Sequence, residues 1–136
     1  MNIVCDTNVL LSGIVFGGIP RQILQLCATG QIINCISPAM LEEVEDVLHR
    51  PKFRLSVEQV RQIMVLLKET FAFVIPTVMV DEIITDPDDN RILETAYAGN
   101  AQAIISGDHH LLELHTWQGI PIMKPADFLH VYHFPC

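Results

Sequence analysis

The sequence contains no long hydrophobic run and has few positively charged residues. Although half of its 136 residues are hydrophobic, no apolar stretch reaches the roughly 18–20 residues that span a bilayer. No basic segment precedes the first apolar stretch, so the N-terminus does not resemble a secretory signal peptide. We therefore expect a cytoplasmic protein with no membrane association.

Cysteine is scarce, and its spacing does not fit a redox or zinc motif. The four cysteines are Cys5, Cys27, Cys35 and Cys136, with no C-x-x-C pair among them. Cys5 and Cys35 fall in apolar runs that we expect to be buried strands. Reduced, buried thiols in a cytosolic protein are the simplest interpretation.

Positively charged residues are also few. Eight Lys and Arg residues face sixteen Asp and Glu residues, which gives a formal net charge of −8. This balance argues against a protein that coats nucleic acid through a basic face. It does not exclude a nuclease, because clustered carboxylates can be metal ligands and a bound divalent ion reverses the local field.

Short apolar runs alternate with segments of helical periodicity along the whole chain. The expected strands lie near residues 3–5, 32–36, 73–75, 103–105 and 120–123. We place the last of these at an edge because it contains Pro121. The alternation predicts a single α/β domain over residues 1–136, with a five-stranded, mostly parallel sheet and helices on both faces in three layers.

The first thirteen residues hold the most informative stretch. Asp6 directly follows the apolar run of residues 3–5 and precedes Thr7 and Asn8, which favour turns and helix caps. A carboxylate between a strand and a helix lies at the carboxyl end of the strand, where α/β sheets bind ligands. Asp6 is therefore either a site residue or a cap for the next helix.

Three further acids are expected at the same edge of the sheet. Asp108 directly follows the fourth strand, Glu43 lies in the second turn of the helix after the second strand, and Asp89 begins the helix after the third. Right-handed crossovers bring these positions and Asp6 to one carboxyl edge. Near Asp89, we expect Asp86 to cap the helix and Asp88 to lean toward solvent.

Converging carboxylates repel one another, and a hard divalent cation relieves that repulsion. Mg²⁺ and Mn²⁺ prefer oxygen ligands and can activate water for attack on a phosphodiester. We expect Asp6, Glu43, Asp89 and Asp108 to be both metal ligands and catalytic residues. The hydroxyls of Thr7 and Ser106 would orient ligands or water, and Asn8 would hold the Asp6 side chain.

The same residues form short motifs whose order and spacing resemble those of PIN domains: Asp6-Thr7-Asn8, Ser37-Pro38 followed by Glu43, Asp86-Pro87-Asp88-Asp89, and Ser106-Gly107-Asp108. The resemblance covers the whole chain and is greatest to toxin–antitoxin PIN proteins related to VapC-type toxins. It implies a Mg²⁺- or Mn²⁺-dependent ribonuclease, a homodimer, and inhibition by a cognate antitoxin. No acid of the family pattern is missing.

Two other functions remain open from the residues. A haloacid-dehalogenase-type phosphatase also begins with an Asp after the first strand, but it needs a second Asp where this chain has Asn8. A non-catalytic PIN-like module that binds RNA or a protein partner is the second alternative. An RNA cleavage assay with Mn²⁺ separates that module from an enzyme.

Histidines and a basic stretch complete the candidates. His109 and His110 lie beside Asp108, and His130, His133 and Cys136 form H-x2-H-x2-C. Neither group matches a closed zinc motif, so we expect solvated or helix-end histidines. The cations of the basic stretch would either contact RNA phosphates or stabilise a helix C-terminus; they are Arg50, Lys52 and Arg54.

Overall fold

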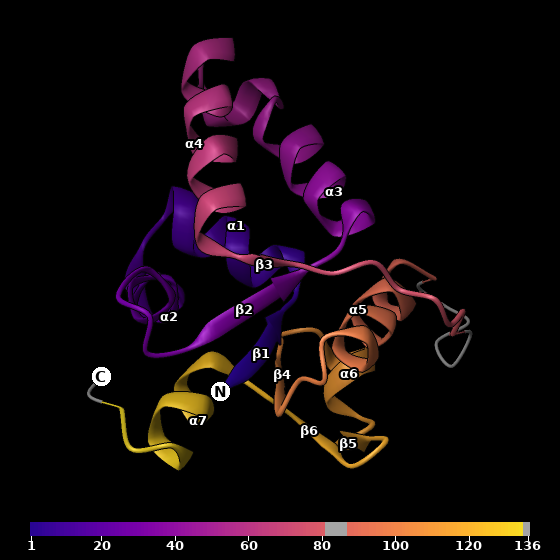
Figure 1. Ribbon diagram of the computed structural model, residues 1–136. Helices are drawn as coiled ribbons and strands as arrows, with labels where there is room; N and C mark the ends of the chain where they lie inside the picture. The colour runs from indigo at the N-terminus through magenta and orange to yellow at the C-terminus, as the bar shows by residue number, and fades with distance from the viewer. Residues whose placement is uncertain (81–86, 135–136) are drawn as a thin grey trace.

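The computed structural model describes residues 1–80 and 87–134, in which strands and helices alternate as expected (Figure 1). The strands are β1 (Asn2–Cys5), β2 (Ile33–Ile36), β3 (Ala72–Phe73), β4 (Ala103–Ile105), β5 (Thr116–Trp117) and β6 (Ile120–Met123). The helices are α1 (Thr7–Val15), α2 (Gly18–Ala28), α3 (Pro38–Leu48), the 3₁₀ turn η1 (Pro51–Phe53), α4 (Val57–Thr70), α5 (Pro87–Ala98), α6 (His109–Leu112) and α7 (Pro125–Val131).

The strands form a six-stranded sheet in the order β3-β2-β1-β4-β6-β5. Neighbouring strands are parallel except for β5 and β6, which are antiparallel. The expected mostly parallel α/β sheet is thus confirmed, with one strand more than predicted and a shorter third strand. The prediction that residues 120–123 form an edge strand is wrong, because β5 pairs outside them. Pro121 lies opposite Thr116 of β5, while pairing of β6 with β4 begins at Ile122.

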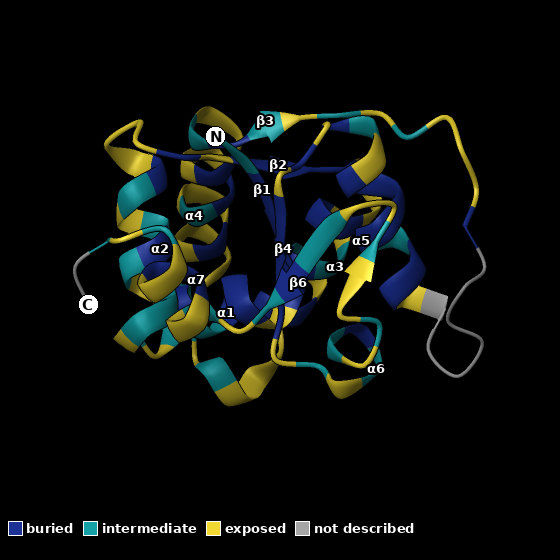
Figure 2. Ribbon diagram, turned by 90° about the horizontal axis from the view of Figure 1, so that it is seen from below, coloured by how far each residue is buried: buried dark blue, intermediate teal, exposed yellow. Residues whose placement is uncertain are grey.

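Helices cover both faces of the sheet, as the three-layer prediction requires. Figure 2 shows α2 and α7 on one face and α5 on the other. Every residue of β4 is fully buried, and Ile3, Val4 and Cys5 of β1 are equally inaccessible. Continuous burial of this kind is the property of parallel strands enclosed between two helical layers. The carboxyl edge of the sheet is therefore built on two enclosed central strands.

Strand β2 differs from the expected apolar strand in one respect. Ile33 is 43% exposed, whereas Asn34 is fully buried. The Asn34 side chain accepts a hydrogen bond from the Cys5 amide at 2.9 Å, beyond the Ile3–Asn34 pair where the backbone register of β1 with β2 ends. A side chain thus replaces the next backbone partner of β1, immediately before Asp6.

Within the described ranges, no single helix is long and apolar enough to cross a bilayer. The pair α1 and α2 reaches that length and composition only together, and it is bent by 95° at the break between them.

Candidate metal centre at the carboxyl edge of the sheet

Asp6 is both a helix cap and a buried member of the candidate site. It is 3% exposed, and its amide continues the sheet by donating to the Ile105 carbonyl at 2.9 Å. One carboxylate oxygen accepts the Val9 amide at 2.7 Å, which caps α1. The other oxygen accepts the hydroxyl of Ser106 at the end of β4. The carboxylate is therefore held by two different elements. The same side chain caps α1 and lines the cavity of the candidate site.

Burial raises the pKa of the Asp6 carboxyl above its ordinary value of 3.8, and the nearby Asp108 charge adds to the increase. Hydrogen bonds from the Ser106 hydroxyl and the Val9 and Gly107 amides act in the opposite direction without cancelling it. A bound cation would favour the ionised carboxylate, because opposite charge lowers the pKa of an acid. This position is electrostatically suited to a metal ion.

Ser106 connects two of the predicted acids. Its hydroxyl donates to Asp6 and accepts the backbone amide of Asp108 at 2.9 Å. The Asp108 carboxylate in turn accepts the amide of His110 at 2.8 Å and caps α6. A single buried hydroxyl thus links the Asp6 side chain to the Asp108 backbone.

Glu43 reaches the site from α3. Ser37 caps this helix and Pro38 occupies its first turn, as the sequence predicts. Glu43 is half-buried, and the Thr7 hydroxyl donates to its Oε1 at 3.0 Å. Thr7 is itself buried in the first turn of α1. The hydrogen bond ties α3 to α1, and Glu43 lines the same cavity as Asp6.

The first turn of α5 supplies two acids rather than one. Asp89 is 7% exposed and Asp88 is exposed, as their predicted positions on the helix require. Both nevertheless line the cavity that holds the other acids. Asp88 is therefore an additional candidate, which the sequence assigned to solvent. The predicted cap at Asp86 lies outside the described residues.

All the predicted acids meet in one small cavity of about 70 Å³. Its lining consists of Asp6, Thr7, Asn8, Glu43, Asp88, Asp89, Ile92 and Asp108. Carboxylate oxygens are the ligands that Mg²⁺ and Mn²⁺ prefer, so the donor set fits such an ion. Asn8 lines the same cavity, and the described hydrogen bonds to the Asp6 carboxylate come from the Val9 amide and the Ser106 hydroxyl.

The three cations proposed to contact RNA lie in different environments. Arg50 lines a cavity of about 330 Å³ that shares Glu43 and Asp88 with the acidic cavity. Lys52 instead lies over the Phe53 ring, 5.0 Å from its centroid, and Arg54 ends η1 with a left-handed backbone. Of this stretch, Arg50 is the residue that the structure brings next to the acids.

Histidines beside Asp108 approach the site from α6. The potential ligand atoms of Asp108, His109 and His110 all lie within 4.8 Å of one another, and the two rings are 4.0 Å apart between centroids. His109 is exposed and is therefore well placed to meet solvent or a ligand. Cys136, the last residue of the H-x2-H-x2-C pattern, lies outside the described residues.

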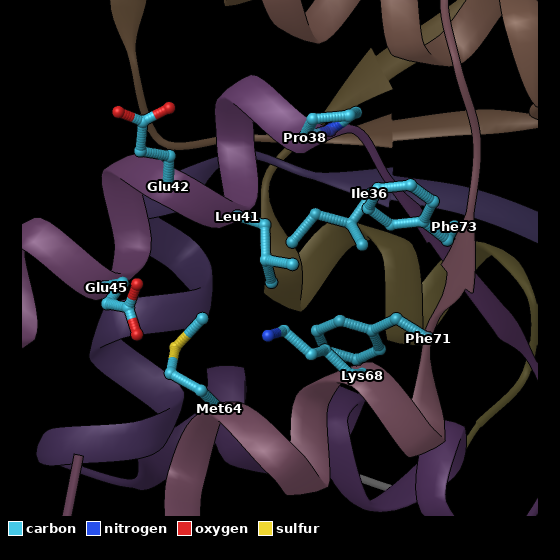
Figure 3. Close-up of a pocket in the computed structure, with 9 residues that line it drawn as sticks. All are labelled: Ile36, Pro38, Leu41, Glu42, Glu45, Met64, Lys68, Phe71 and Phe73. Atoms are coloured by element: carbon cyan, nitrogen blue, oxygen red, sulfur yellow. The ribbon is translucent and has the colours of Figure 1, made fainter. Parts of the chain in front are cut away.

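A larger cavity of about 510 Å³ lies between α3 and α4 and extends to β3 (Figure 3). Ile36, Leu41, Met64, Phe71 and Phe73 give it an apolar lining, while Lys68, Glu42 and Glu45 supply charge. It includes none of the four predicted site acids. The larger cavity and the four site acids therefore define different places in the molecule.

The fold and the site together define an α/β protein that gathers carboxylates at the carboxyl edge of its sheet, a donor set that suits a divalent cation. The PIN-domain family model matches residues 2–110, and the chain belongs to this family. PIN domains are generally nucleases, and they typically use divalent metals.

Similar proteins agree with the family assignment. The chain is 32% identical over 120 residues to the uncharacterized protein MJ1680 of Methanocaldococcus jannaschii, a match covering 84% of this chain and 75% of that protein. VapBC2 from Rickettsia felis, solved bound to a DNA fragment from its promoter, matches with a TM-score of 0.62 at 13% identity, over 91% of this chain and 98% of that one. The PIN domain of human SMG5 matches with a TM-score of 0.54 at 16% identity, over 97% and 99%.

Proposed function

We propose that the protein is a Mg²⁺- or Mn²⁺-dependent endoribonuclease. The observation that carries this proposal is the convergence of Asp6, Glu43, Asp89 and Asp108 on one cavity at the carboxyl edge of the sheet. Nucleases use such acids to hold cations that neutralise the scissile phosphate. Membership of the PIN family supports a nucleic-acid hydrolase. RNA as the substrate is our inference from the resemblance of the motifs to VapC-type toxins.

In this mechanism the acids bind the cation and the surrounding hydrogen bonds fix the acids. A divalent ion, when bound by these acids, would supply the positive charge for activating a water molecule and stabilising the leaving oxygen. The Ser106 hydroxyl bonds both the Asp6 carboxylate and the Asp108 amide, and the Thr7 hydroxyl bonds the Glu43 carboxylate. Asp88, at the exposed rim of the same cavity, would accept hydrogen bonds from water entering with the substrate.

A protein partner is the second part of the proposal. The likeness to VapBC2 and the VapC-like motifs support a role as the toxin of a toxin–antitoxin pair. A homodimer is proposed from the resemblance of the motifs alone. The cavity is rich in carboxylates, so it would attract a basic side chain of a cognate antitoxin. Such a side chain would replace the cation electrostatically and so block cleavage.

Cleavage of defined single-stranded RNAs with Mg²⁺, Mn²⁺ or EDTA tests the proposed activity. We expect cleavage with either metal, none in EDTA, and none for Asp6→Asn with metal present. Asp127→Asn is the matched control, since Asp127 is also an acid in the first turn of a helix but does not line the acidic cavity. Activity that persists in EDTA would contradict the proposal. An intact fold without cleavage in any metal would favour the non-catalytic binding module.

A further inference from the structure

The acidic cavity adjoins two larger cavities, and the three together are called the groove below. It shares Asn8 and Asp108 with a cavity of about 490 Å³, and a separate pair, Glu43 and Asp88, with the cavity of about 330 Å³ that contains Arg50. Because the two shared pairs differ, the acidic cavity adjoins the two larger cavities at different residues. A chain-like ligand whose reactive group lay at the acids would extend into both.

The two flanks of the groove differ in chemistry. The flank beyond Glu43 carries charges of both signs: its lining adds the acids Glu42 and Asp46 and the cations Arg50 and Arg91. Arg91 is committed to an ion pair with Glu94 at 2.9 Å and to the Val80 carbonyl at 3.2 Å. Arg50 is exposed and is the cation there that can meet a phosphate.

The flank beyond Asn8 is different. Apart from the shared acid Asp108 and the His109 ring, its side chains are uncharged and partly apolar: Asn8, Val9, Ser12, Pro20 and Pro125, with Gly107 completing the lining. A phosphate would meet the Asp108 carboxylate there without an arginine or lysine to offset it. An uncharged planar group is the better occupant.

His109 gives that flank a stacking surface. Its ring lines the cavity, is exposed to solvent, and rests against the His110 ring at 4.0 Å with an interplanar angle of 37°. The histidine pair is presented by α6, whose start is fixed by the Asp108 cap. Proteins recognise unpaired bases by stacking them on aromatic rings, histidine included.

We propose that the flank lined by His109, Val9, Pro20 and Pro125 binds one unpaired nucleobase of single-stranded RNA, adjacent to the phosphate held at the acids. This inference rests on the proposed function for the identity of the ligand. It adds a binding subsite that selects an unpaired base beside the cleavage point. The base stacks on His109, while the phosphate backbone of the RNA continues past the acids toward Arg50.

The test measures binding separately from cleavage. A fluorescent single-stranded RNA is titrated in Ca²⁺, a hard cation with the same preference for oxygen ligands, and gels verify that the RNA stays intact. An abasic site is then moved along the RNA one position at a time. For the wild-type protein, we expect one position to weaken binding roughly five- to tenfold, the size of a single stacking contact.

Substitutions at the ring identify the stacking partner. His109→Ala should weaken binding of the intact RNA by a similar factor and abolish the effect of the abasic position. His109→Phe should restore both, because it keeps an aromatic face without a nitrogen that could ligate metal or donate a proton. His130→Ala, a change of another exposed histidine on α7, is the control and should leave binding unchanged.

Three results would overturn the subsite. In the first, no abasic position weakens binding more than the others. In the second, the abasic position weakens binding equally in wild type and His109→Ala, and in the third His109→Phe binds as weakly as His109→Ala. The absence of RNA binding by the wild type would overturn it as well. If the scan behaves as expected but the wild type never cleaves RNA with Mg²⁺ or Mn²⁺, the proposed catalysis fails while the subsite stands.

Discussion

Ser106→Ala is the most informative single substitution because one hydroxyl connects the two central acids. The Ser106 side chain is fully buried, donates to the Asp6 carboxylate and accepts the Asp108 amide at 2.9 Å. Alanine removes both interactions without adding bulk. Neither partner can gain a new hydrogen bond from the substituted residue.

The expected loss of folding stability in Ser106→Ala follows from these two hydrogen bonds. A hydrogen bond to a charged group contributes about 1.5–3 kcal/mol and a neutral one about 1 kcal/mol, so the metal-free protein should lose about 2.5–4 kcal/mol. Ser106 makes the largest contribution that lowers the Asp6 pKa, so that already raised pKa should increase further in the variant. RNA cleavage should fall as well, since Asp6 and Asp108 lose their common support.

The stability difference between wild type and Ser106→Ala depends on pH. A native carboxyl with a raised pKa holds its proton longer than the unfolded chain does, so stability falls as pH rises from the ordinary value of 3.8 through the native pKa. The variant has the higher native pKa, and its stability therefore falls further. The difference between wild type and Ser106→Ala should be smallest at acid pH, where the lost bond to the Asp108 amide still costs about 1 kcal/mol, and should grow as the pH rises through the native pKa.

Urea unfolding in EDTA at several pH values measures that difference. Ser12→Ala, at a half-buried serine of α1 outside the acidic cavity, is the control and should change stability by about 0.5 kcal/mol or less. A Ser106→Ala effect below about 1 kcal/mol at neutral pH, or one independent of pH, would refute the argument that this hydroxyl stabilises the charged Asp6.

Three further predictions concern the acids and the packing of α5. Asp6→Asn should abolish metal-dependent cleavage while the metal-free protein melts at the same or a higher temperature, because a buried charge is removed; a melting temperature several degrees lower in EDTA would contradict this. Asp89→Asn should lose cleavage whereas Asp88→Asn, at an exposed position, should retain most of it; equal losses in a kinetic assay would make Asp88 a ligand too. Gly99→Ala should destabilise the fold by about 1–3 kcal/mol, because its Cβ would lie 2.8 Å from the Cys35 sulfur. Adding Cys35→Ala should recover part of that loss in the same denaturation assay.

The order of strands and helices is predictable from the sequence because burial dictates it. The apolar runs of β1 and β4 are bracketed by polar residues, and such runs in an alternating pattern have few arrangements other than a parallel sheet. Strand β5 could not be predicted because two residues are too few to show a periodicity. The burial of Asn34 could not be predicted either, because it depends on a hydrogen bond from the amide of Cys5, which is distant in sequence.

The acids are predictable for a related reason. Residues that directly follow parallel strands must reach the same edge of the sheet, which places Asp6 and Asp108 without any knowledge of side chains. The partners are harder to assign: Asn8 precedes Val9 in the first turn of α1, yet the hydroxyl that reaches Asp6 comes from Ser106, one hundred positions away. Likewise, the place of Asp88 at the cavity and of His109 on its flank depends on how α5 and α6 begin.

The origin of the oxygen atom in the product tests the central claim most directly. RNA is cleaved by the wild-type protein with Mn²⁺ in water enriched in ¹⁸O, and the fragments are weighed by mass spectrometry. Attack by water at the acidic cavity predicts a 5′-phosphate that carries one ¹⁸O and a 3′-hydroxyl that carries none. A 2′,3′-cyclic phosphate without ¹⁸O would show attack by the 2′-hydroxyl of the RNA and would contradict the account.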